Sequence, residues 1–265
     1  MTATAPSATA AAPRLRVAAH SLTLARRSLT KTLRTPEQLI DVTLQPVIFL
    51  SLFLYLLGGA VAGSRGEYLT FLLPAVMVQT VVFAATATGI NLNNDISKGV
   101  FDRFRSLPIA RSAPLLGAVL GDMIRSVVCV TVLLGFGYAL GVRVATGPLS
   151  ALAGCLLVLA FGFAVTWGSV LLGVLAREPG SVQGILFLAM FPLTFGTDMI
   201  TPAETMPGWP QWWVNVNPVT DVMAAARALL TGGPAAGPVL RALAWSAALF
   251  AVLFPLAVRA YRRKT

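Results

Sequence analysis

The chain is divided by its ionisable residues into long apolar intervals. A helix needs about 20 apolar residues to cross a hydrocarbon core about 30 Å thick, and several of the intervals reach that length. None of them alternates apolar and polar residues as the strands of a membrane barrel do, and only a helix satisfies its backbone hydrogen bonds within one segment. We therefore predict six transmembrane helices. They cover residues 42–64, 68–94, 126–143, 144–176, 179–197 and 242–258.

Composition argues against a water-soluble globule. Of the 265 residues, 56% are hydrophobic and 11% are charged, and the mean hydropathy is +0.78. Such a chain has too few polar side chains to cover a water-exposed surface, so a bilayer is its expected solvent. The predicted fold class is an all-α integral membrane protein, in which residues 36–265 form a six-helix transmembrane domain.

The basic residues predict the orientation in the membrane. The chain has 20 basic and 10 acidic side chains, an excess that in another protein would indicate nucleic-acid binding. Here fifteen of the basic residues fall on one side of the six spans, whereas the other side holds Arg65, Arg143, Arg227 and Arg241. By the positive-inside rule, both termini are expected in the cytoplasm. We predict a multi-pass protein of a bacterial inner (plasma) membrane, with no nucleic-acid partner.

Two segments before the first span have patterns of their own. Residues 1–13 form an Ala/Thr/Pro tract, which is predicted to be a disordered tail. Residues 14–35 place leucines and alanines on one face of a helix and cations such as Arg27 and Lys31 on the other, so an amphipathic helix in the membrane interface is expected. This helix either serves as a lever or docking surface for a partner or simply anchors the chain.

A few residues in or beside the spans are unusual for an apolar helix. Asp122 and Arg125 are three residues apart, so they can pair on one helix face near the cytoplasmic end of the third span. A structural pair is favoured over a proton relay, because the carboxylates of the chain cluster near the predicted ends of spans. Pro46, which follows Gln45, and Pro192 could line a substrate path or shape helix packing.

The cytoplasmic segment between the second and third spans predicts a short amphipathic helix over about residues 94–108. Asn93 or Asn94 can cap its start, and Pro108 ends it. Phe101 is exposed beside the apolar face, an arrangement that suits the groove of a protein partner. Alternatively, the helix rests on lipid headgroups. The apolar face consists of Ile96, Val100, Phe104 and Leu107, and the polar face of Asp95, Lys98, Asp102 and Arg105.

The segment over about residues 198–237 lies on the outer side in this topology. It contains several prolines and three tryptophans, and tryptophans are typical of the membrane interface. Residues 218–230 have a helical pattern, but they are too few and, with Asp221 and Arg227, too polar to span a bilayer. A re-entrant or surface-lying hairpin is therefore expected.

The sequence lacks the motifs of an enzyme. A phosphate-binding loop needs a lysine that follows a glycine, but the three lysines follow Thr30, Ser97 and Arg263. The chain has one histidine, His20, and neither a Cys/His metal cluster nor a Gly-x-Ser-x-Gly motif. We therefore predict that the chain has no catalytic residues, binds no metal and does not hydrolyse ATP by itself.

Three motifs follow one another along the chain. Arg34-Thr35-Pro36 leads into the first span, and residues 95–111 read DISKGVFDRFRSLPIAR. The third motif begins with MPGW at 206–209 and continues with NPVT at 217–220 and ARAL at 226–229. Their order and spacing resemble the membrane subunits of type-2 ABC exporters, particularly the daunorubicin/doxorubicin-resistance permease branch.

This resemblance implies the type-2 ABC transporter fold, with six helices, a cytoplasmic coupling helix and outer re-entrant helices. The implied partners are two ABC ATPase subunits, a second permease subunit of the same or a similar chain, membrane lipid and a small-molecule substrate. The chain itself would bind no cofactor, because ATP and Mg would lie on the partner ATPase. The implied function is that of a permease subunit which exports a hydrophobic or amphipathic drug or natural product. The alternatives are an ABC exporter of polysaccharide or lipid, an ATP-independent secondary carrier and a non-transporting scaffold.

The resemblance and the helical pattern also indicate which residues couple the chain to the ATPase and which form an outer gate. At the start of the coupling motif the family often has a glutamate, where this chain has Asp95. The residues expected to couple to the ATPase are Asp95, Gly99, Val100, Phe101, Arg103, Phe104, Arg105 and Pro108. The residues expected to form an outer gate are Pro207, Trp209, Asn217 and Pro218. The residues of the substrate path are not identified by these motifs.

Overall fold

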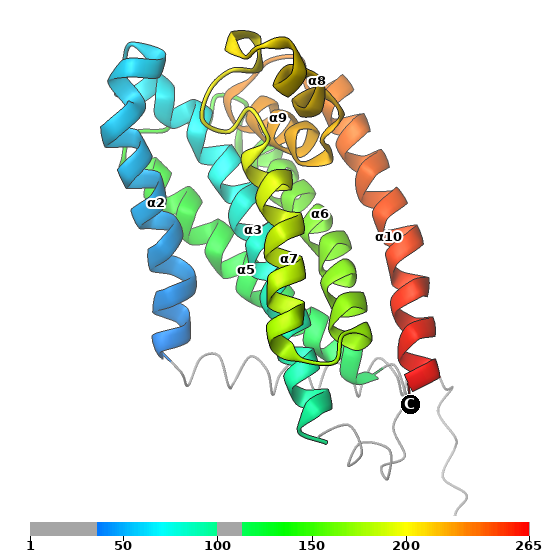
Figure 1. The fold of residues 1–265 in the computed structure, drawn as a ribbon. Coiled ribbons are helices and arrows are strands. Elements are labelled where there is room, and N and C mark those ends of the chain that lie inside the picture. The colour runs from blue at the N-terminus through cyan, green and yellow to red at the C-terminus, as the bar shows by residue number, and fades with distance from the viewer. Residues whose placement is uncertain (1–35, 100–112, 265) are drawn as a thin grey trace, which may run out of the picture.

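The structure, a computed structural model, describes residues 36–99 and 113–264. All regular elements in these two ranges are helices, as the predicted fold class requires. Six of them form a bundle, and short helices lie across one end of it (Figure 1). The bundle consists of α2 (Pro36–Ala62), α3 (Arg65–Ser97), α5 (Ala113–Ala139), α6 (Pro148–Leu175), α7 (Pro179–Phe195) and α10 (Ala236–Lys264). The short elements are η1 (Ala203–Thr205), α8 (Gly208–Val216) and α9 (Pro218–Thr231).

Each predicted span corresponds to one helix of the bundle. Five of these helices are long and apolar enough to cross a membrane. The other, α7, has 17 residues, and at about 1.5 Å per residue it is shorter than the hydrocarbon core of a bilayer. Its first turn contains Pro179, a position where proline is tolerated, and it ends at Phe195 with Gly196 as its C-cap.

The third span differs most from the prediction. It was expected over residues 126–143, but α5 begins at Ala113 and ends at Ala139. The helix continues through Asp122 and Arg125 because their side chains form an ion pair, which reduces the cost of placing charge in an apolar helix. The expectation that the carboxylates lie near the ends of spans is therefore wrong for Asp122. After α5 the chain turns at Gly141, whose φ of 106° suits a glycine.

α3 is the central helix of the bundle. It contacts α2, α5, α6, α7 and α9, and the residues between Leu72 and Gln79 are all buried. The crossing of α3 with α6 is especially close at two glycines. A Cβ atom on Gly89 would lie 2.3 Å from the carbonyl oxygen of Ser169, and one on Gly173 would lie 2.4 Å from the carbonyl oxygen of Gly89. Any larger residue at either position would therefore separate the two helices.

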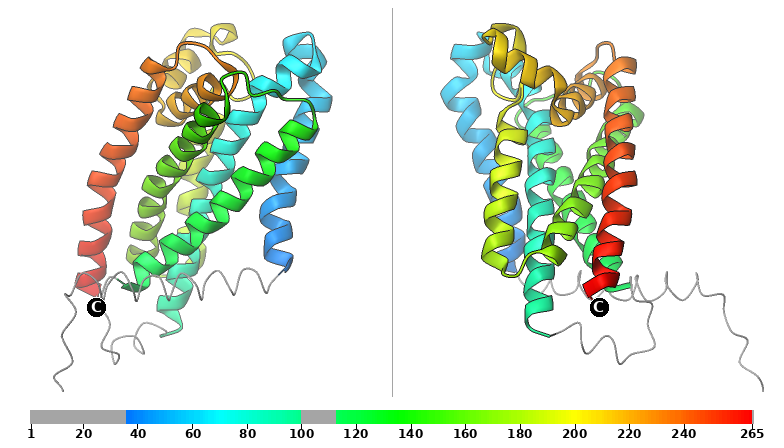
Figure 2. Two further views of the ribbon diagram at one scale, coloured as in Figure 1. Left: turned by 180° about the vertical axis from the view of Figure 1, so that it is seen from behind. Right: turned by 45° about the vertical axis from the view of Figure 1, so that its right-hand side comes forward.

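The helices are arranged so that α2 and α10 lie on opposite sides of the bundle, with α3 and α6 between them (Figure 2). The end of the bundle with α8 and α9 is called the upper end, as in Figure 1. The opposite end, called the lower end, holds the last turn of α3, the connection between α6 and α7, and the last turn of α10. The predicted disordered tail (1–13) and interfacial helix (14–35) lie outside the described residues.

Candidate functional site

A cavity of about 580 Å³ opens between α2, α3, α5 and α7. Most residues of α3 that line the cavity are spaced three or four positions apart, so they form a stripe on one face of the helix. This stripe begins at Val76 and ends at Asn91, so it follows α3 for about 20 Å at 1.5 Å per residue. Gln45 and Pro46 of α2 also line the cavity, whereas Pro192 is not part of its wall.

Phenylalanines form the apolar part of the wall. Phe187, Phe191 and Phe195 recur every fourth residue on α7, and the rings of Phe191 and Phe195 are 4.7 Å apart. Phe195 also meets Phe49 of α2 and Phe83 of α3, with ring centroids 6.4 and 6.3 Å apart. Phe187 is 59% exposed and Phe191 is 47% exposed, so one side of the cavity is open in the single chain. Such a wall can hold a flat apolar molecule by stacking and burial.

The polar part of the wall comes from three helices. Gln45 lies on α2, Gln79, Thr80 and Asn91 lie on α3, and Arg125 lies on α5. Thr80 donates its hydroxyl hydrogen to the carbonyl oxygen of Val76 at 2.7 Å, so it offers a ligand only an acceptor. An apolar cavity with a few convergent polar groups is the usual form of a small-molecule site.

Arg125 and Asp122 form the ion pair that the sequence predicted. Asp122 is almost completely buried, with 2% of its side chain exposed, whereas Arg125 keeps 17% exposed and reaches the cavity wall. The pair has no net charge, but its dipole has a direction. The positive end, Arg125, lies at the cavity wall, and the negative end, Asp122, lies behind that wall.

At the upper end, Asn217 joins two helices. Its side-chain oxygen accepts a hydrogen bond from the backbone N–H of Val219 at 2.9 Å and so caps the first turn of α9. Its side-chain nitrogen donates to the carbonyl oxygens of Leu193 and Gly196, both at 2.8 Å, at the end of α7. Asn217 is 2% exposed, and its two partly buried bonds to the end of α7 fix the start of α9 to that helix. Pro218 occupies the first turn of α9.

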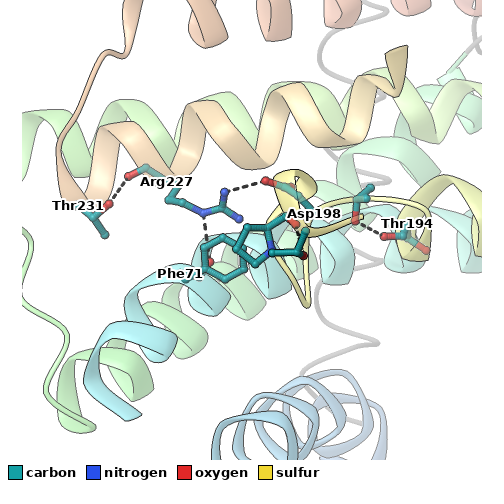
Figure 3. A network of polar contacts seen from close by, with 8 residues as sticks. Phe71, Thr194, Asp198, Arg227 and Thr231 are labelled. Carbon is teal, nitrogen blue, oxygen red and sulfur yellow. Dashed lines mark hydrogen bonds and ion pairs between the residues drawn. The ribbon is translucent and has the colours of Figure 1, made fainter. Parts of the chain in front are cut away.

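Arg227 of α9 makes a second set of contacts with the bundle (Figure 3). Its Nη1 pairs with Oδ2 of Asp198 at 2.9 Å, and its Nε donates to the carbonyl oxygen of Phe71 at 3.3 Å. Its guanidinium carbon also lies 3.9 Å from the centre of the Phe71 ring. Tyr68 donates to the carbonyl oxygen of Ile200 at 3.2 Å. The connection after α7 is thereby held to α3 and α9 by several bonds.

The other residues expected at the outer gate lie farther from these contacts. Pro207 is the N-cap of α8, and Trp209 is 81% exposed at the start of that helix. The predicted hairpin over about 198–237 corresponds in the structure to η1, α8 and α9, and the helical pattern of residues 218–230 is confirmed by α9. Its position relative to a membrane remains a prediction.

At the lower end, Asn93 has a role that the sequence did not indicate. It does not cap a separate helix, because α3 continues through it to Ser97. Instead, its side-chain nitrogen donates to the carbonyl oxygens of Gly173 at 2.8 Å and Ala176 at 3.0 Å, at the end of α6. Nζ of Lys264, on α10, donates to the carbonyl oxygens of Val174 at 2.6 Å and Ala176 at 3.3 Å. Three helices therefore meet around the end of α6.

Two of the predicted coupling residues are described. Asp95 is exposed in the last turn of α3, so the start of the predicted helix at about 94 is the end of α3 instead. Gly99 follows with a φ of 68°, and its N–H donates to the carbonyl oxygen of Ile96 at 3.1 Å, which turns the chain out of the helix. The remaining predicted coupling residues lie outside the described ranges. They are Val100, Phe101, Arg103, Phe104, Arg105 and Pro108.

The sequence prediction missed the cavity and the contacts of Arg227. A signal for the cavity existed, since Gln79, Thr80 and Asn91 fall on one face of a span that is otherwise mostly apolar. Polar residues on one face of a membrane helix normally point to the protein interior or to a water-filled cavity. For Arg227 the signal was weaker, because its partner Asp198 is 29 residues away in the chain.

Comparison with known proteins shows what the chain is similar to. The profile of the ABC-2 type transporter family matches residues 20–231. The daunorubicin resistance ABC transporter permease protein DrrB1 of Streptomyces coeruleorubidus is 45% identical over 229 residues, which cover 86% of this chain and 81% of that protein. The probable doxorubicin resistance ABC transporter permease protein DrrC of Mycobacterium tuberculosis is 28% identical over 84% of this chain and 81% of its own length.

Proposed function

Because the chain belongs to the ABC-2 type transporter family, we propose that it is the permease subunit of an ATP-driven exporter of amphipathic aromatic molecules. The observation that carries this proposal is the cavity between α2, α3, α5 and α7. Its phenylalanines suit the flat apolar body of such a molecule, and its amides and Arg125 suit the polar groups. The names of the relatives, which refer to daunorubicin and doxorubicin resistance, agree with a substrate of this class.

A second permease subunit would close the open side of the cavity. Phe187 and Phe191 line the cavity and are also largely exposed, so a single chain leaves much of the binding surface uncovered. The neighbouring face of α2 exposes Ile48, Leu52 and Tyr55. Pairing with the same or a similar chain would bury these groups and enclose the substrate between two copies of the wall.

The lower end is proposed to face the cytoplasm. Among the described residues it carries Lys98, Arg177 and four basic residues in the last two turns of α10, which the positive-inside rule places in the cytoplasm. The segment that follows Gly99 would then meet the two ATPase subunits, which bind ATP and Mg. At the upper end, Arg227 and Arg241 are each paired with an aspartate.

In this mechanism the ATPase subunits supply the energy of ATP hydrolysis, and the helix bundle provides the path of the substrate across the membrane. ATP would favour the closed ATPase dimer, and that preference would reach the spans through the segment after α3. A ligand can shift a conformational equilibrium only by its different affinity for the two states, so the coupling segment must contact the ATPase differently in each. The substrate would enter the cavity from the cytoplasm or inner leaflet and leave at the upper end.

The coupling step can be tested with the whole complex. The chain is coexpressed with the products of the neighbouring genes, and the purified complex is placed in proteoliposomes that report ATP-dependent uptake of daunorubicin. We expect uptake with the wild-type chain. With Phe101→Asp we expect the chain to stay in the membrane and ATP-driven uptake to be lost. Failure of any ATPase to copurify would instead support an ATP-independent carrier.

The cavity can be tested with two exposed residues of the same helix. Phe191 and Leu188 are both exposed on α7, but only Phe191 lines the cavity. We expect Phe191→Ala to reduce daunorubicin uptake about tenfold or more, since one aromatic contact is worth up to about 1.5 kcal/mol beyond its buried area. Leu188→Ala should leave uptake nearly unchanged. Equal effects of the two substitutions would show that the cavity is not the substrate path.

A further inference from the structure

Arg125 lies where an unpaired cation would be unfavourable. It belongs to the part of α5 that is apolar and long enough to cross a membrane, Leu115–Ala139. Ionisable residues inside such a segment are costly, and they normally face a cavity or a partner. Arg125 does both, since it pairs with Asp122 and contributes to the cavity wall.

The surroundings of the pair determine what the cavity presents to a ligand. Asp122 lies behind the wall with 2% of its side chain exposed, so the ligand meets the arginine and not the carboxylate. Among the described residues that line the cavity, Arg125 is the charged one, and the other polar residues are uncharged. A guanidinium group carries five N–H donors and no acceptor, and one carboxylate leaves some of these donors free. In the described part of the chain Asp122 engages Nη2, and Nε is buried without a partner, so the 17% of the side chain that stays exposed is what a ligand in the cavity can meet.

The aromatic rings of the wall and its charged group come from different helices. Phenylalanines of α7 and α2 provide apolar surface, whereas Arg125 is contributed by α5. A molecule bound between them would place its aromatic body against the rings and one end against the guanidinium. In a cavity of low dielectric, a charge-assisted hydrogen bond to an oxygen acceptor is strong, and an ammonium group at the same place is repelled.

We propose that Arg125 determines specificity in this cavity, by binding an oxygen acceptor, above all a carboxylate or phenolate, at one end of an aromatic ligand and by rejecting a cation there. This inference rests on the proposed function, because it assigns the chemical class of the group that the substrate path recognises. Asp122 acts as a positioning residue, since it holds the guanidinium in the wall and neutralises its charge when the cavity is empty.

The experiment compares two photoreactive probes that differ in their charged end. They are 4-benzoylbenzoate, which is an anion, and 4-(aminomethyl)benzophenone, which is a cation. The full-length chain in native membranes is labelled without ATP, and the labelled peptides are identified by mass spectrometry. Labelling of α3 and α7 peptides is divided by labelling of α10 peptides, which corrects for the different concentrations of the two probes in the membrane.

The matched variant removes both charges together. Arg125→Met alone would leave Asp122 buried without a partner and could fail to fold, whereas replacing a whole buried ion pair by apolar residues is often harmless. We therefore use the double substitution Asp122→Leu with Arg125→Met. Arg125→Lys is the conservative variant, because it keeps the charge but loses the planar group of donors.

In the wild-type chain we expect the corrected labelling of α3 and α7 by the anion to exceed that by the cation about tenfold. The double substitution should bring the ratio close to one, and Arg125→Lys should give an intermediate ratio. A ratio near one in the wild-type chain, or a preference that survives the double substitution, would overturn the proposal but leave the cavity as the substrate path. Absence of α3 and α7 labelling by both probes would overturn the role of the cavity as well.

Discussion

Two asparagines, one at each end of the bundle, make nearly the same bonds in different settings. Asn93 at the lower end and Asn217 at the upper end each donate two hydrogen bonds to the last carbonyl groups of another helix. Asn93 lies inside the long helix α3 and holds the end of α6, where Lys264 of α10 adds further bonds. Asn217 lies in the single-residue link between α8 and α9 and holds the end of α7.

The two ends differ in how many side chains donate hydrogen bonds to the last carbonyl groups of the helix that is held. At the lower end Asn93 and Lys264 both donate to the carbonyl oxygen of Ala176, so this group keeps a donor when either side chain is lost. At the upper end one side chain serves both α9 and the end of α7, and no second donor to the carbonyl oxygens of Leu193 and Gly196 is present in the described part of the chain. In the described part of the chain, the last carbonyl groups of α7 therefore depend on Asn217 alone for hydrogen bonds to the start of α9, whereas Arg227 holds the connection that follows α7.

The comparison is tested most strongly by Asn217→Ala. This substitution removes the cap of α9 and leaves two partly buried carbonyl groups without donors, so the free energy of unfolding should fall by about 3 kcal/mol. Asn217→Ser keeps a side-chain acceptor for the N–H of Val219 but removes both amide donors, and it should cost less. Thermal unfolding in detergent micelles measures both variants. An equal loss in the two would show that the cap contributes nothing.

A smaller effect is expected for Arg227 at the same end. Its side chain is 19% exposed and bonds to Asp198 and Phe71, so Arg227→Met should cost about 2 kcal/mol of unfolding free energy. The matched control is Arg241→Met, which breaks the pair with Asp221 but changes a side chain that is 59% exposed. Asp221 is 12% exposed, but water reaches the pair from the side of Arg241, so the control should shift the unfolding midpoint less than Arg227→Met does. Equal shifts would contradict the network of Figure 3.

The smallest effect is expected at the lower end. Asn93→Ala should cost about 1 kcal/mol, because Lys264 still donates to the carbonyl oxygen of Ala176. Lys264→Met alone should cost less, but the double variant should lose more than the sum of the two, since Ala176 then has neither donor. Additive losses in a double-mutant cycle would show that the two donors do not replace one another.

The fold was largely predictable because hydrophobic length alone identifies membrane helices. The six predicted spans each became a helix, and the helix over 218–230 was found from its pattern. The error at α5 arose because charge was used to end a span, whereas Asp122 and Arg125 neutralise each other inside the helix. A single charged residue does not reliably mark the end of a membrane span when a residue of opposite charge lies three or four positions away on the same helix.

The site was predictable only in part. The motif around Asn217 marked an important residue, but the sequence could not show that it bonds to the end of α7, since that contact depends on how the helices pack. The cavity combines residues of four helices, and Asn93 and Gly173 are 80 positions apart. Local periodicity contains no information about such distances, and the motifs of the family pointed to the coupling segment instead.

If α7 spans the bilayer, as the sequence predicts, its shortness would make the protein sensitive to its lipids. With 17 residues, α7 is a few ångströms shorter than an average hydrocarbon core, whereas α3 has 33 residues and α10 has 29. A bilayer spanned by α7 would then thin beside it, and the energy of this mismatch would grow with the length of the lipid chains. Since Phe187, Phe191 and Phe195 all lie on α7, the geometry of the aromatic wall is linked to membrane thickness. Lipid composition would thereby become a regulator of export.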